Sequence, residues 1–122
     1  MSDEFLRVAR QEIQTEIDNL NEIFLSCTND EQLYVKLGDI EEHMHKIKGL
    51  APMMGQEEMG EIARISDIII KHVLGHGTLK GSHDTILDAI KRMTDIFNGQ
   101  TNIQTEDFRK HVKNNYPDIS GF

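Results

Sequence analysis

Apolar residues recur every three or four positions along nearly the whole of this chain, and this spacing constrains the fold more than any other feature. An α-helix has about 3.6 residues per turn, so such a spacing gathers the apolar side chains on one face of a helix. A strand would instead alternate apolar and polar residues, and that pattern is not seen. The sequence therefore predicts an all-α protein.

Five helices are predicted, and capping or turn-forming residues mark most of their ends. Asn29 is a candidate N-cap for the second helix and Ser82 for the fourth. Pro52 cannot donate a backbone hydrogen bond, so we expect the second helix to kink or end there, with Gly55 supplying a left-handed turn. The expected helices span about residues 2–25, 31–51, 56–74, 82–98 and 105–115.

Each of the four long helices carries one apolar stripe that we expect to be buried. The stripe of the first helix comprises Phe5, Val8, Ala9, Ile13, Ile17, Leu20 and Phe24. That of the second comprises Leu33, Leu37, Ile40, Met44, Ile47, Ala51 and Met54. Four amphipathic helices with short loops predict an antiparallel up-down four-helix bundle, with the short fifth helix on its flank, in a single domain over residues 1–122.

The charge and the single cysteine limit the partners and the compartment. A net charge of −8 argues against a nucleic-acid surface, because phosphate backbones favour clustered Lys and Arg. No apolar run is long enough to span a membrane, and residues 1–10 are too polar for a signal peptide. Cys27 has no partner for an internal disulfide, which fits a reducing cytosol. We therefore expect a cytoplasmic protein that contacts neither nucleic acid nor membrane.

The segment from His45 to Gly49 is the strongest candidate for a functional site. Residues at i, i+3 and i+4 are neighbours on a helix, so His45, Lys48 and Gly49 share one side of a turn. His45 also lies about 100° round the helix from Met44, at the edge of the buried stripe. An exposed imidazole nitrogen is a nucleophile, and a nearby ammonium offsets the charge of an incoming phosphate. The segment therefore favours a histidine that accepts and passes on a phosphoryl group.

The string His-x-x-Lys-Gly resembles the signature of histidine phosphotransfer (HPt) domains, and the wider sequence resembles the N-terminal HPt domain of chemotaxis kinases of the CheA family. The specific match covers about residues 45–70. The resemblance implies a helical bundle in which His45 is phosphorylated by the ATP-binding domain of a histidine kinase and then attacked by an aspartate of a response-regulator receiver domain. It also implies that Asp67, 22 residues after His45, bonds the other ring nitrogen, where the family usually has Glu.

The same resemblance implies that ATP and Mg²⁺ come from the partner domains. We expect this chain to bind no cofactor and no metal itself, and to be a phosphotransfer intermediate and not an enzyme when it acts alone. A monomer is expected because one face must stay open. Either a free-standing protein or the excised front of a larger kinase, and then a chemotaxis role, is compatible with the sequence.

Departures from the family pattern support an alternative. Glu41 and Glu42 stand where the family commonly has a bulky apolar residue and Arg, and two carboxylates repel a phosphoryl group unless they dock a basic partner or tune His45. The alternative is an acidic helical bundle that binds or inhibits a two-component signalling partner without being phosphorylated. Arg64, in place of a second histidine of the family, is expected to contact phosphate or to pair with Glu61 or Asp67.

The remaining histidines are weaker candidates. His43 lies two residues from His45, on another face of the helix, and is expected to be solvated. His72 and His76 are spaced i,i+4, which suits a transition metal, although no Glu or Cys completes a ligand set around them. A metal-responsive helical bundle is therefore the second alternative.

Overall fold

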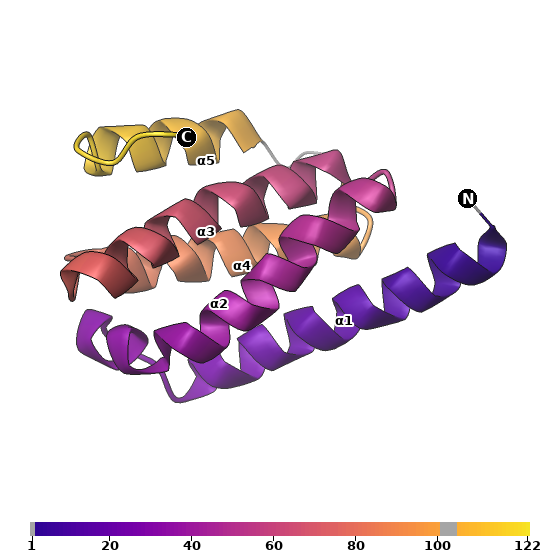
Figure 1. Cartoon of the computed structure of the whole chain (residues 1–122), viewed down its shortest axis with the longest axis horizontal. Helices are drawn as coiled ribbons and strands as arrows, with labels where there is room; N and C mark the ends of the chain where they lie inside the picture. Colours follow the sequence, from indigo (N-terminus) through magenta and orange to yellow (C-terminus); the bar gives the residue numbers. More distant parts are fainter. Residues whose placement is uncertain (1, 101–104) are drawn as a thin grey trace.

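The computed structural model describes residues 2–100 and 105–122, and all regular secondary structure within these residues is helical. The helices are α1 (Asp3–Leu25), α2 (Asp30–Met53), α3 (Glu57–His76), α4 (Ser82–Phe97) and α5 (Thr105–Asn115) (Figure 1). Over the described residues the prediction of an all-α chain with five helices is confirmed, and each helix end lies within about two residues of the expected position.

The ends of α2 follow the predicted capping chemistry closely. The side chain of Asn29 accepts a hydrogen bond from the backbone N–H of Gln32 at 2.8 Å, as an N-cap does. At the other end Pro52 lies inside the last turn, and the helix ends one residue later, at Met53. Gly55 then turns the chain toward α3 with a φ of 78°, a left-handed conformation that favours glycine.

The start of α4 differs from the prediction. Gly81, with a φ of 83°, is its N-cap, and Ser82 is the first helical residue. The capping role expected of Ser82 is wrong, because the carboxylate of Asp30 accepts hydrogen bonds from the N–H groups of Gly81 and His83 at 2.9 and 2.8 Å. The first turn of α2 therefore caps α4 across the fold, an arrangement that local sequence does not reveal.

The predicted stripe of α2 is buried in one core with apolar residues of α3 and α4, except that Met54 is half-buried. In the α1 stripe Phe5 is half-buried and Val8 is 43% exposed. The N-terminal turns of α1 project past the ends of the other helices (Figure 1). Phe108 and Val112 of α5 are fully buried, so the fifth helix contributes to the core. Burying a side chain of this size contributes about 1.5–3 kcal/mol to folding.

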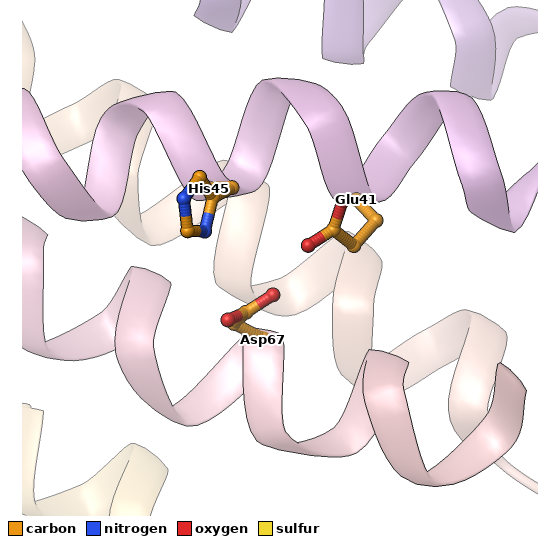
Figure 2. Close-up of side chains that lie close together, drawn as sticks. All are labelled: Glu41, His45 and Asp67. Atoms are coloured by element: carbon orange, nitrogen blue, oxygen red, sulfur yellow. The ribbon is translucent and has the colours of Figure 1, made fainter. Parts of the chain in front are cut away.

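The order of packing places the candidate residues. α2 lies between α1 and α3, α4 packs on α3, and α5 packs on α3 at the side away from α1 (Figure 1). Because α2 and α3 lie side by side, the turn of α2 that carries His45 faces the turn of α3 that carries Asp67 (Figure 2). Among the described residues, no helix has both the length and the apolar composition needed to cross a membrane.

Candidate functional site

The structure brings the predicted site residues together where α2 and α3 meet. His45 is exposed, Lys48 is half-buried, and Asp67 on α3 is only 2% exposed. The ammonium of Lys48 donates a hydrogen bond to Oδ2 of Asp67 at 2.8 Å. Gly49 is exposed on the next turn, and a Cβ added there would meet no atom within 4 Å. The approach to His45 from this side is therefore open.

Asp67 is a buried carboxylate whose two oxygens have different surroundings. Oδ2 accepts hydrogen bonds from both Lys48 and Lys71, at 2.8 and 2.9 Å. Oδ1 is buried and has no hydrogen-bond partner among the described residues. Burial by itself would raise the pKa of Asp67, but the hydrogen bonds and charges of the two lysines outweigh burial, and the pKa is lowered. Asp67 is therefore ionised near neutral pH, with one oxygen unused.

Glu41 is brought to the same place. It lies one turn before His45 on α2, and the carboxylate of Asp67 points from α3 toward both side chains (Figure 2). An oxygen of Glu41, a ring nitrogen of His45 and an oxygen of Asp67 all lie within 4.8 Å of one another. The i,i+4 spacing of Glu41 and His45 was visible in the sequence and indicates neighbours on one face. Glu42, by contrast, is exposed and lies outside this cluster.

Lys71 is a site residue that the sequence analysis missed. Its hydrogen bond to Asp67 raises the pKa of Lys71, with further contributions from the charges of Asp67 and Glu41. Asp67 and Lys71 are spaced i,i+4, so the signal was present but looked like an ordinary surface ion pair. The site therefore holds two carboxylates and two ammonium groups beside one imidazole.

Arg64 lies in a different cluster. Its Nε donates to Glu61 at 3.0 Å, and its Nη1 donates to the carbonyl of Gly121 at 2.7 Å. Of the roles expected from sequence, the structure shows the pairing with Glu61, and Arg109 of α5 reaches the same carboxylate at 2.8 Å. Hydrogen bonds from Arg64, and then from Arg109, lower the pKa of Glu61 to about 2.

His43 is not solvated, and that prediction is wrong. It is half-buried, and its Nδ1 makes a short hydrogen bond to the carboxylate of Glu16 on α1. Glu16 is 7% exposed, and Lys46 lies 3.6 Å from its other oxygen. His43 lies beside the core stripe of α2, on a side that α1 partly covers, and this packing cannot be inferred from the spacing within α2 alone. This contact joins α1 to α2 directly beside the His45 turn.

The His72–His76 pair shows no completed metal site. The two rings stack with centroids 4.0 Å apart, and Nδ1 of His76 is hydrogen-bonded to the carbonyl of His72 at 2.8 Å. In the part of the chain that the structure describes, the only group of three or more close potential ligands is Glu41, His45 and Asp67. The metal site that the sequence suggested at His72 and His76 therefore has no third ligand among the described residues.

An open groove of about 680 Å³ runs between α1 and α2 next to His45. Two of its apolar side chains are unusually exposed, Val8 at 43% and Met53 at 48%. Its other lining residues include Glu12, Glu16, His45, Gly49 and Leu50. The exposed imidazole is thus flanked by a mixed apolar and acidic surface.

Comparison of the chain with protein-family models, with curated proteins and with solved structures finds no match. An exposed imidazole with an ionised, buried carboxylate on one side and solvent on the other has the parts of a nucleophile. Ammonium groups within reach suit a reaction that brings in negative charge.

Proposed function

We propose that this chain is a phosphotransfer module of two-component signalling, with His45 as the phosphoacceptor. Helices α1 to α4 would form an antiparallel four-helix bundle that holds α2 rigid, with α5 on its flank. The phosphoryl group would come from the ATP-binding domain of a histidine kinase and leave to the receiver-domain aspartate of a response regulator. Both ATP and Mg²⁺ belong to those partners, and chemotaxis is the setting that the resemblance to CheA-family kinases implies.

The observation that carries the proposal is the closeness of an exposed His45 to a buried, ionised Asp67: a ring nitrogen and a carboxylate oxygen lie within 4.8 Å of each other, although no hydrogen bond joins them among the described residues. A carboxylate that accepts the N–H of one imidazole nitrogen leaves a lone pair on the other nitrogen and stabilises the imidazolium-like product. Oδ1 of Asp67 is the oxygen without a partner, and it belongs to the carboxylate that points toward His45 (Figure 2). This arrangement supports a nucleophilic role for the outward-facing nitrogen.

Two lysines donate to the same oxygen of Asp67, so Lys48 is available to bind a phosphoryl group as well. When a phosphoryl group arrives on His45, Lys48 can leave Oδ2 and pair with the phosphoryl oxygens, because Lys71 still holds the carboxylate. Charge neutralisation of this kind is what phosphoryl transfer most requires of its surroundings. Lys71 would act as a positioning residue that keeps Asp67 ionised and in place.

The two transfer steps balance as simple displacements. In the first, a lone pair of the His45 imidazole attacks the γ-phosphorus of ATP, the bond to the β–γ bridging oxygen breaks, and ADP leaves with that electron pair. In the second, a carboxylate oxygen of the receiver aspartate attacks the same phosphorus and the P–N bond breaks. His45 is then restored, and the groove beside it, with Leu50 and Met53, would receive the receiver domain.

The test is phosphorylation by a CheA-family kinase core that lacks its own phosphotransfer domain. Wild type, His45→Gln, Lys48→Ala and His111→Gln would be incubated with labelled ATP and the kinase. We expect acid-labile label on wild type and on His111→Gln, an exposed-histidine control, none on His45→Gln, and slower labelling of Lys48→Ala. Full labelling of His45→Gln would reject the assignment.

The alternative, an acidic bundle that binds a signalling partner without chemistry, is favoured by one observation. Glu41 lies within 4.8 Å of both His45 and Asp67, so a phosphoryl group on the near nitrogen would face two carboxylates. Binding of a receiver domain by a protein that takes no label from the kinase, nor from a small phosphoramidate donor, would support this alternative.

A further inference from the structure

We propose that Glu41, His45 and Asp67 form a binding site for one Zn²⁺ ion, bridging α2 and α3. The proposal does not rest on phosphotransfer, because it requires only the three side chains. Figure 2 shows them converging on one point, two from successive turns of α2 and one from the facing turn of α3. Their candidate ligand atoms all lie within 4.8 Å of one another.

The distances and the side-chain freedom are compatible with a metal. Zn²⁺ binds nitrogen and oxygen ligands at about 2.0–2.2 Å, which places neighbouring ligand atoms about 3.3–3.6 Å apart in a tetrahedral site. The observed separations require the side chains to approach one another by about 1.5 Å or less. His45 is exposed and Glu41 half-buried, so both side chains have room to rotate toward the buried Asp67.

A second observation points to a ligand at this place. Asp67 is 2% exposed, and its Oδ1 has no hydrogen-bond partner among the described residues, although a buried carboxylate oxygen left unpaired costs free energy. Lys48 and Lys71 both occupy Oδ2, so they leave Oδ1 to another group. A cation coordinated by Oδ1 would satisfy that oxygen without displacing either lysine.

The ligand set selects the class of metal. One imidazole nitrogen and two carboxylate oxygens suit Zn²⁺ and its neighbours among the divalent transition metals, whereas Mg²⁺ and Ca²⁺ prefer oxygen ligands throughout. Three protein ligands leave a fourth position open toward solvent, and the two nearby ammonium groups oppose a cation. The site is therefore a weak, exchangeable one that draws its affinity from two carboxylate charges.

Calorimetric titration of ZnCl₂ into the untagged, chelator-treated chain tests the proposal. We expect one ion per chain, with affinity reduced at least tenfold or so in both Glu41→Gln and His45→Gln. Glu42→Gln is the matched control, since it removes an adjacent exposed carboxylate, and should bind as wild type does. The ring-nitrogen resonances of His45 should shift on addition of Zn²⁺. Circular dichroism of each variant would show that loss of binding is not loss of fold.

Three outcomes would overturn the site. The first is that no Zn²⁺ binds and the His45 ring-nitrogen resonances do not shift. The second is that His45→Gln binds Zn²⁺ as wild type does while a His72→Gln variant loses binding. The third is that Mg²⁺ binds as tightly as Zn²⁺. Phosphorylation of His45 would be assayed separately, after any bound Zn²⁺ has been removed with a zinc-selective chelator. A chain that takes label but binds no Zn²⁺ rejects this inference alone, and one that binds Zn²⁺ but takes no label rejects only phosphotransfer.

Discussion

At the scale of single residues, Asp67 has the most unusual environment of the candidate site. A carboxylate that is 2% exposed would normally be protonated or fully hydrogen-bonded, yet Asp67 is ionised and uses only one of its oxygens. The two lysines that keep it ionised come from both helices, Lys48 from α2 and Lys71 from α3. Asp67 therefore links α2 to α3 through its two ion pairs and places a negative charge near His45.

Replacing Asp67 by Asn should lower the free energy of unfolding by about 1–2 kcal/mol at pH 7, because two ion pairs become hydrogen bonds from ammonium groups to a neutral amide. Urea unfolding followed by circular dichroism measures this difference. The pKa of Asp67 is lowered in the folded state, so its contribution is complete above the ordinary carboxyl pKa of about 3.9 and shrinks as the pH falls below it. Glu58→Gln, on the exposed face of α3, is the control and should be nearly neutral. Equal losses in both variants would contradict the role of Asp67.

The site could be predicted from the sequence where its contacts lie within one helix, and only in part elsewhere. His45, Lys48 and Gly49 share a turn, so their spacing alone placed them together. The i,i+4 spacing also places Glu41 beside His45. The burial of Asp67 and its contact with Lys48 depend on how α3 lies against α2, which apolar spacing does not specify.

At the scale of the helices, the close approach of α2 and α3 depends on a glycine. A Cβ at Gly60 would lie 2.7 Å from Cγ and 2.9 Å from Cδ of Pro52, distances that real Cβ contacts do not show. The proline ring is rigid, so neither helix can yield by a simple side-chain rotation. This contact fixes the separation of α2 and α3 at the end near the connecting turn, and through it the distance between Lys48 and Asp67.

Gly60→Ala should therefore reduce stability by about 1–3 kcal/mol, by overpacking against Pro52. Part of the loss should return in the double variant Gly60→Ala/Pro52→Ala, since the two positions are in contact. Gly38→Ala on the exposed face of α2 is the control, because a Cβ there meets no atom within 4 Å and should stabilise by up to about 1 kcal/mol. Thermal and urea unfolding would measure all three. A Gly60→Ala variant as stable as Gly38→Ala would show that the helices can separate freely.

The helix boundaries could be predicted to within about two residues because caps, prolines and glycines act locally. The cap of α4 could not, since its acceptor, Asp30, is 51 residues from Gly81. Ser82 satisfied the local rule, but its hydroxyl donates to the carbonyl of Leu79 instead. A local signal was thus overridden by a tertiary hydrogen bond.

Asp30→Ala should cost about 1–2 kcal/mol of unfolding free energy, because two N–H groups at the start of α4 lose their acceptor. Glu31→Ala is a matched control: both residues are acidic and lie in the first turn of α2, but among the described residues only Asp30 accepts hydrogen bonds from the start of α4. Hydrogen exchange of the Gly81 and His83 amides would locate the effect, with faster exchange expected only in Asp30→Ala. Equal exchange in the two variants would contradict the cap.

At the scale of the whole molecule, α3 connects the candidate site to the far side of the fold. One face of α3 presents Asp67 to α2, and another presents Glu61 to α5 and to the last described residues. Arg64 and Arg109 both donate to Glu61 and to the carbonyl oxygen of Phe122. This charged network fastens α5 and the segment after it onto α3 outside the apolar core.

The network should add its own contribution to the acid dependence of stability, through the carboxylate of Glu61. The pKa of Glu61 is about 2 in the folded state against an ordinary 4.5, so its contribution is complete above about pH 4.5 and is lost as the pH falls toward 2. Because the Glu61 side chain is 31% exposed, we expect about 1–2 kcal/mol and not the full value of the shift. The advantage of wild type over Glu61→Gln in urea unfolding should therefore be present at pH 7 and mostly absent near pH 2. Glu106→Gln is the control, since Glu106 also pairs with Arg109 but is 68% exposed. If the two variants showed the same dependence on pH, the charge of Glu61 would not be what holds α5 to α3.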